Sequence, residues 1–167
     1  GISNRHIHLT EADLEILFGK GYELTKIKDL KQPGEYAAKE KVIIVGPKGS
    51  IEGVRVLGPL RKRTQIEISL TDSYKLGVKP PVKDSGDLDG SPGITIVGPQ
   101  GTVILKEGVI LAARHIHLHT SEAEEFGLEN GQRVQVEVQG ERGIVFSNVL
   151  LRVGSNYAKE IHLDTDE

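Results

Sequence analysis

One pentapeptide, Arg-His-Ile-His-Leu, occurs twice without a change, at residues 5–9 and 114–118. Side chains alternate between the two faces of a β-strand, so the two histidines of each copy point to the same side. Looser copies of the pattern, a short alternating strand followed by Thr and acidic residues, begin at Ile66 and Ile161. The repeat predicts a duplicated fold whose chemistry lies on the repeated strands.

A second repeat consists of two Gly-Pro turns, Val-Gly-Pro-Lys-Gly-Ser at 45–50 and Val-Gly-Pro-Gln-Gly-Thr at 97–102. Each turn is flanked by apolar segments, and the chain has twenty Gly and seven Pro, a composition typical of short strands joined by tight turns. We predict a mainly β fold of two β-barrel-like domains with short flanking α-helices, related as a pseudo-repeat. The strands expected beside these turns are 42–45, 51–57, 94–97 and 103–111.

We divide the chain into two metal-binding β-barrel halves, 1–78 and 94–167, and leave open an exchange of strands between them. Residues 79–93 are rich in Gly, Pro and Asp and are interpreted as a connecting or substrate loop. The 167 residues are too few for an eight-stranded α/β barrel, which needs about 250 residues. This excludes the metal hydrolases that carry His-x-His strands on that barrel.

Two short helices are expected, directly after the first and third copies of the strand pattern. Thr10, and either Thr120 or Ser121, stand where the N-cap residue belongs, and acidic residues follow in the first turn. Leu14 and Leu17 supply the apolar stripe of the first helix.

The composition excludes several classes of function. A net charge of −3 and few aromatic residues argue against nucleic-acid binding. No apolar run reaches the roughly 18 residues of a membrane span, and no secretory segment is present. Because the chain has no cysteine, a metal must be held by His, Asp or Glu. The chain has no Met and starts at Gly1, from which we expect a trimmed N-terminus; we also expect a homo-oligomer, a dimer or larger.

Two metal sites follow from the repeated strands. Glu67 in the second copy and His162 in the fourth stand where the first and third copies have a histidine. Three protein ligands with an open fourth position are typical of catalytic zinc. The histidines could instead be ordinary strand residues, but their placement on an exact repeat favours ligation. The expected ligand sets are His6, His8 and Glu67 for one metal, and His115, His117 and His162 for the other.

The densest positive cluster, Leu60-Arg-Lys-Arg-Thr64, directly precedes the strand of Glu67. It is either a solvated turn or an anion clamp, in which a guanidinium fork binds two phosphate oxygens. Residues 84–86, Asp-Ser-Gly, could add a hydroxyl and backbone amides to the same anion.

Taken together, these motifs resemble the PduL-type phosphate propanoyltransferases, the phosphotransacylases of bacterial propanediol-utilisation microcompartments and related pathways. The resemblance covers essentially the whole chain. The segments that carry it are 4–10, 45–49, 56–59, 65–69, 113–117 and 161–165.

The resemblance implies reversible transfer of a propanoyl or acetyl group between coenzyme A and phosphate, with acyl phosphate as the other substrate. It implies two Zn²⁺ ions on the two ligand sets above, and it assigns phosphate binding to Arg61 with Ser85 as a partner. Arg61 and Glu67 are the residues we expect to be catalytic. The expected location is the cytoplasm, either free or inside a bacterial microcompartment.

Two alternative functions remain open from the sequence. A zinc hydrolase of acyl phosphates or thioesters is the main alternative, because water and thiol could occupy the same open metal position. A single-metal cupin-like oxygenase or binding barrel is disfavoured, because the site is duplicated. The chain offers no Ser-His-Asp or Cys-His set, which favours direct transfer over an acyl-enzyme.

Overall fold

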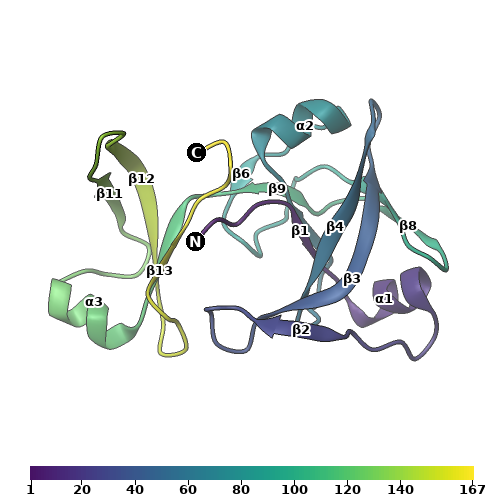
Figure 1. The fold of residues 1–167 in the computed structure, drawn as a ribbon, viewed down its shortest axis with the longest axis horizontal. Coiled ribbons are helices and arrows are strands. Elements are labelled where there is room, and N and C mark those ends of the chain that lie inside the picture. The colour runs from purple at the N-terminus through teal and green to yellow at the C-terminus, as the bar shows by residue number, and fades with distance from the viewer.

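The computed structural model describes residues 1–167, and its architecture is mainly β, as predicted (Figure 1). Two curled sheets and three short helices make up the chain, and all three helices are too short to cross a bilayer. The elements are β1 (His6–His8), α1 (Glu11–Phe18), β2 (Lys26–Asp29), β3 (Tyr36–Val45), β4 (Ser50–Gly58), β5 (Gln65–Glu67), α2 (Leu70–Leu76), β6 (Val82–Lys83), β7 (Ile94–Val97), β8 (Thr102–Leu105), β9 (Val109–Ala112), β10 (His115–Leu118), α3 (Thr120–Phe126), β11 (Arg133–Val138), β12 (Ile144–Val153) and β13 (Glu160–His162).

The larger sheet has nine strands in the order β6-β9-β5-β1-β4-β3-β7-β8, with β2 paired to β3. The smaller sheet has the order β11-β12-β10-β13. Strands β7, β8 and β9 follow the segment 79–93 but lie in the larger sheet, so the chain passes between the sheets after β9. The division into halves 1–78 and 94–167 stays a prediction, and the exchange of strands left open there would have to include β7, β8 and β9.

The strands β1 and β10, which carry the repeated pentapeptide, occupy equivalent places in the two sheets. β1 runs parallel to β4 and antiparallel to β5, while β10 runs parallel to β12 and antiparallel to β13. In the antiparallel pairs His6 is opposite Glu67, and His115 is opposite His162. The first copy of the strand pattern is thus paired with the second, and the third with the fourth.

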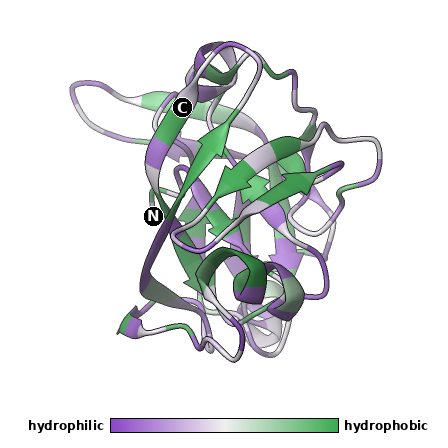
Figure 2. Ribbon diagram, turned by 90° about the vertical axis from the view of Figure 1, so that its right-hand side faces the viewer, coloured by the Kyte–Doolittle hydropathy of each residue, from purple (hydrophilic) through white to green (hydrophobic).

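The main hydrophobic core lies inside the larger sheet and contains 17 buried residues. Ile7, between the two histidines of β1, is fully buried in this core, so alternation directs His6 and His8 to the other face of the strand. In the smaller sheet Ile116 packs in the same way against a cluster of only three buried residues. Figure 2 shows the apolar colour concentrated on the strands, with more polar loops around them.

Helix α1 begins after Thr10, whose hydroxyl accepts a hydrogen bond from the amide of Asp13 at 3.1 Å, and this N-cap was predicted correctly. The predicted cap of α3 was wrong. His119 is its N-cap, and the imidazole Nδ1 accepts a hydrogen bond from the amide of Ser121. The usual N-cap residues accept through a side-chain oxygen, and here an imidazole nitrogen takes that place.

Two further elements differ from expectation. Helix α2, after the second copy, was not predicted, although Ser69 caps it by accepting from the amide of Asp72. The single strand expected at 103–111 is two strands, β8 and β9, because Gly108 between them has a φ of +148° that breaks the extended run.

Candidate metal and anion-binding site

The first cluster, defined as His6, His8 and Glu67, is formed by β1 and β5. Its three side chains are buried, with exposed fractions of 7%, 2% and 6% for the residues, and the candidate ligand atoms all lie within 4.8 Å of one another. The two imidazole rings are perpendicular, with centroids 5.0 Å apart, so they meet edge to face and do not stack in parallel. Nε2 of His6 lies 3.5 Å from Oε2 of Glu67.

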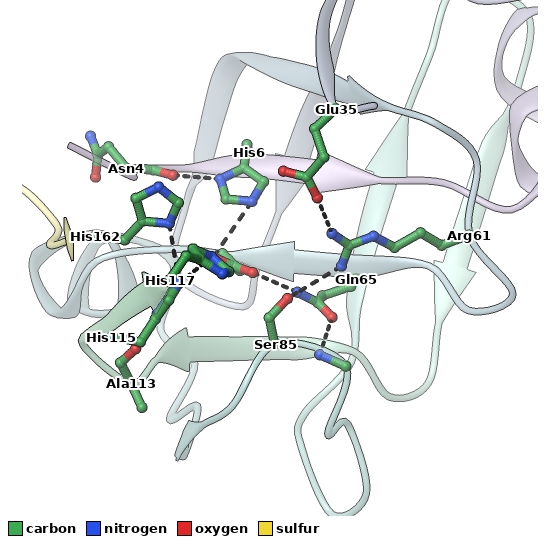
Figure 3. Close-up of polar contacts among 12 residues, drawn as sticks. Asn4, His6, Glu35, Arg61, Gln65, Ser85, Ala113, His115, His117 and His162 are labelled. Atoms are coloured by element: carbon green, nitrogen blue, oxygen red, sulfur yellow. Dashed lines mark hydrogen bonds and ion pairs between the residues drawn. The ribbon is translucent and has the colours of Figure 1, made fainter. Parts of the chain in front are cut away.

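The second cluster, defined as His115, His117 and His162, repeats this arrangement on β10 and β13. The rings of His115 and His117 are again perpendicular, with centroids 4.8 Å apart. Nε2 of His115 lies 3.2 Å from Nε2 of His117 and 3.1 Å from Nδ1 of His162, as the converging side chains in Figure 3 show. Both sets of three predicted residues therefore come together in the structure.

Opposing charges govern the first cluster. Burial raises the pKa of Glu67, but attraction to His6, and the contact with that ring, more than offset it, and the pKa lies far below its ordinary value. Burial lowers the pKa of His6, yet Glu67 raises it, and the net shift is upward. Burial and then the repulsion from His6 hold the pKa of His8 well below its ordinary value.

The second cluster has no carboxylate member and favours neutral imidazoles. Burial and the neighbouring His115 lower the pKa of His117 to about 3, and burial also lowers the pKa of His115. Nε2 of His162 contacts Oε2 of Glu160 at 2.9 Å, which leaves Nδ1 of His162 directed to the cluster. This is the carboxylate–histidine arrangement that orients metal-binding imidazoles.

Both clusters contain ring nitrogens that lack suitable hydrogen-bond partners, as expected where imidazoles bind a divalent metal. Nδ1 of His8 and Nδ1 of His117 are buried and have no hydrogen-bond partner, a rare condition for a polar atom in a protein interior. In the second cluster three ring nitrogens approach one another at hydrogen-bond distance, although a neutral imidazole has only one N–H. Because a cation would accept the lone pairs of the converging nitrogens, Nε2 of His115, Nε2 of His117 and Nδ1 of His162, this donor set suits Zn²⁺.

Nδ1 of His6 contacts the carbonyl of Asn4 at 2.8 Å, and Nδ1 of His115 contacts the carbonyl of Ala113 at the same distance. A carbonyl accepts only, so it fixes the proton on Nδ1 and leaves Nε2 free as the ligating atom.

Both clusters open into one cavity of about 650 Å³ between the two sheets. Its rims are joined by Gln32, whose side-chain amide bonds both the carbonyl and the amide of Ala158 at 2.8 and 3.2 Å. Basic side chains from both sheets line the cavity, among them Lys28, Arg55 and Arg152. The cavity therefore presents two candidate cation sites and positive walls to a single ligand.

Arg61 reaches the cavity beside the first cluster (Figure 3). Its backbone amide donates to the carbonyl of Leu9 at 2.8 Å, which ties the basic turn to the end of β1. One guanidinium nitrogen donates to Oγ of Ser85 at 3.2 Å, and another donates to Oε1 of Glu35 at 3.2 Å. By contrast, Arg63 is 47% exposed and paired with Asp89 and Glu107 on the surface.

Comparison with known proteins identifies the family to which this chain belongs. The family model of phosphate propanoyltransferase matches residues 1–167. The chain belongs to the phosphate propanoyltransferase family. A phosphate propanoyltransferase of Thermotoga maritima is 60% identical over all of this chain and 80% of its own length. One from Rhodopseudomonas palustris is 54% identical over all of this chain and 74% of its own length. The protein is thus a phosphate acyltransferase.

The structure adds three residues to the site of this phosphate acyltransferase that the sequence analysis missed. Glu35 pairs with Arg61, Glu160 contacts His162, and Gln65 donates to Oε1 of Glu67 at 2.6 Å. Gln65 was detectable in principle, because in a strand it lies on the same face as Glu67. Glu35 lies in the loop before β3, and its proximity to Arg61 depends on the tertiary fold.

Proposed function

We propose that this phosphate acyltransferase moves a short acyl group, propanoyl or acetyl, reversibly between coenzyme A and inorganic phosphate at a site holding two Zn²⁺ ions. The single observation that carries the proposal is that both three-residue clusters open into the same cavity beside Arg61. The names of the relatives, phosphate propanoyltransferases, support propanoyl as the acyl group.

His6, His8 and Glu67 would hold one metal, and the second cluster, His115, His117 and His162, would hold the other. When bound, such metals polarise a carbonyl and favour the deprotonated form of a thiol. The first site would carry one negative ligand and the second none, so the second keeps more positive charge.

Arg61 has the geometry to hold phosphate. A guanidinium presents its N–H donors as a planar fork that matches two phosphate oxygens, and one side of the fork in Arg61 faces the cavity hydroxyl of Ser85. Glu35 takes another donor and so keeps the guanidinium from rotating away from the cavity. Phosphate held in this way is oriented as nucleophile in one direction and as leaving group in the other.

The basic residues of the cavity, Lys28, Arg55 and Arg152, suit the phosphate groups of coenzyme A. Arg152 also lies over the ring of Tyr157, at 5.9 Å from its centroid, which limits where the guanidinium can point.

We propose direct transfer without an acyl-enzyme. A phosphate oxygen attacks the thioester carbonyl carbon, a C–O bond forms, the C–S bond breaks, and the electron pair leaves with sulfur as thiolate. Ser85 is the hydroxyl nearest the phosphate-binding guanidinium, but its oxygen accepts from both Arg61 and Gln65, which lowers its nucleophilicity.

The test is to incubate the zinc-loaded protein with propanoyl-CoA and phosphate and to measure propanoyl phosphate and free coenzyme A. We expect equal amounts of both products and no release without phosphate. Phosphate-independent release of free propanoate would instead support the zinc hydrolase. Exchange of labelled phosphate into propanoyl phosphate without coenzyme A would contradict direct transfer and indicate an acyl-enzyme. Assembly into a homo-oligomer and placement inside a microcompartment stay predictions.

A further inference from the structure

Gln65 is among the most deeply buried polar side chains of the protein, with an exposed fraction of 1%. It precedes Glu67 by two residues on β5, so both side chains leave the strand on the same face. The amide Nε2 donates to Oε1 of Glu67 at 2.6 Å and to Oγ of Ser85 at 2.9 Å. The amide oxygen accepts from the backbone N–H of Gly86 at 2.8 Å. Figure 3 shows Gln65 beside Ser85, on the same side of the site as Arg61.

These partners fix the orientation of the amide. The backbone N–H of Gly86 can only donate, so the Gln65 oxygen must face it. The opposite orientation would point the amide oxygen at the carboxylate of Glu67 and the NH₂ group at an N–H, two repulsive contacts. Glu67 and Ser85 therefore both receive hydrogen bonds from the two N–H groups of a single rigid amide.

The same network determines what Ser85 can do. A hydroxyl oxygen accepts two hydrogen bonds and donates one. The oxygen of Ser85 accepts from Arg61 and from Gln65, so only its hydrogen remains for a further partner. The hydrogen needs an acceptor oxygen. The carboxylate of Glu67, whose pKa a hydrogen bond from Ser85 helps to lower, supplies one within the protein, and an anion bound to Arg61 supplies another. Gln65 thus directs the Ser85 hydroxyl to act as a donor toward that anion.

We propose that Gln65 is a positioning residue that fixes the metal-binding carboxylate of Glu67 and the hydroxyl of Ser85 relative to each other, and thereby sets the affinity for phosphate. This inference rests on the proposed function, and it deepens that function by naming a determinant of phosphate use. Gln65 contacts neither the phosphate nor the metal in this scheme and acts through its two neighbours.

Gln65→Glu is the sharpest variant, because it keeps the shape and the acceptor for Gly86 but replaces the amide donor with a second carboxyl group against Glu67. The zinc-loaded variant should show a KM for phosphate raised about tenfold or more, the scale expected for losing a hydrogen bond within a charged network. We expect the KM for propanoyl-CoA to change by less than about twofold and the zinc content to match the wild type, since all six ligands remain. Calorimetry with inorganic phosphate should show the same loss without turnover.

Two comparisons separate positioning from general weakening of the fold. Ser91→Ala removes a buried hydroxyl from the same loop, one that donates only to the carbonyl of Leu88, and should leave the KM for phosphate unchanged. Ser85→Ala and Gln65→Ala should each raise that KM, and the double variant should raise it no further than the larger single effect, because Ser85 is the neighbour through which Gln65 reaches the phosphate.

An unchanged phosphate KM in Gln65→Glu would overturn the inference. A parallel rise in both KM values, or a loss of zinc, would also overturn it, because Gln65 would then merely support the fold or the metal. A wild-type protein that releases no acyl phosphate would refute the proposed function instead, while the calorimetric comparison of Gln65→Glu with wild type would still decide whether Gln65 governs phosphate affinity.

Discussion

Arg5 donates two hydrogen bonds to Asp72, from Nε to Oδ2 at 2.8 Å and from a terminal nitrogen to Oδ1 at 2.6 Å. In the second half of the duplicated fold, Arg114 pairs with Glu167 at 2.6 Å. Each acid stands five residues after the third member of its cluster, as 67 to 72 and 162 to 167 show. The arginine of the repeated pentapeptide is therefore a strut that ties the segment after the paired strand to the histidine strand. This segment is α2 after β5 and the last residues of the chain after β13, so the repeat extends beyond the two clusters.

The two struts should differ in their contribution to stability. Arg5→Ala leaves the nearly buried carboxylate of Asp72, 4% exposed, without a charged partner and should reduce the free energy of unfolding by about 1–3 kcal/mol. Arg114→Ala frees Glu167, which is 19% exposed, and should reduce it by about 1 kcal/mol or less. Urea unfolding of both variants measures the difference, and a larger loss for Arg114→Ala would contradict the strut model.

Metal binding at the two clusters should be separable. Glu67→Ala and His162→Ala each remove one expected ligand from one cluster. We expect each variant to retain about one equivalent of zinc and the wild type to hold about two. Elemental analysis after purification without chelator gives the count. His119→Ala is the matched control, because this sixth histidine caps α3 outside both clusters and its loss should leave the zinc content unchanged. Loss of both metals from either ligand variant would show a single coupled site.

Phosphate recognition should depend on the guanidinium of Arg61 and not simply on positive charge. Arg61→Lys keeps the charge but loses the planar fork, so we expect the KM for phosphate to rise about tenfold or more with the zinc content intact. Arg63→Lys makes the same exchange at an exposed residue paired with surface carboxylates, and it should leave phosphate kinetics unchanged. Equal effects of the two substitutions would assign recognition to the basic turn as a whole.

The shifted pKa values of the clustered histidines also predict how the stability of the metal-free protein depends on pH. His117 has a folded pKa of about 3 against an ordinary value of 6.5, so below about pH 6.5 the unfolded chain binds more protons and folding weakens as the pH falls toward 3. The lowered pKa values of His8 and His115 act in the same direction, and that of Glu67 adds to it below its ordinary value of 4.5. His6, whose pKa is raised, opposes the trend because it gains stability on protonation.

Chelator-treated protein should therefore lose stability between pH 7 and pH 5 in urea unfolding, by no more than about 1.4 kcal/mol per pH unit for each group involved. His117→Asn should flatten the slope. A stability that rises as the pH falls through this range would mean that the raised pKa of His6 dominates, which would contradict the expectation.

The sequence predicted the parts of the fold that depend on alternation and repetition. Ile7 turns into the core while His6 turns away from it, because strand geometry requires it. The looser copies of the pattern are the strands that pair with β1 and β10. This pairing places Glu67 and His162 opposite the first histidine of each pentapeptide. Their role as metal ligands stays a prediction.

Other features depend on long-range packing that no local pattern encodes. Glu35 contacts Arg61, and Gln32 contacts Ala158, across large separations in the chain.

Two local features were also missed. The cap of α3 was missed because an imidazole takes the place of a hydroxyl, and the break before β9 because one glycine, Gly108, adopts a positive φ inside an apolar run.

Two metals in one cavity should be needed together for phosphate-dependent acyl transfer. The most direct test of this requirement is to remove metal from the protein with a chelator and to follow conversion of propanoyl-CoA and phosphate as zinc is added back. We expect the chelated protein to be inactive and the rate to rise until about two equivalents of zinc are bound per chain. Full activity in the chelated protein, or a rate that saturates at one equivalent or fewer, would contradict the account.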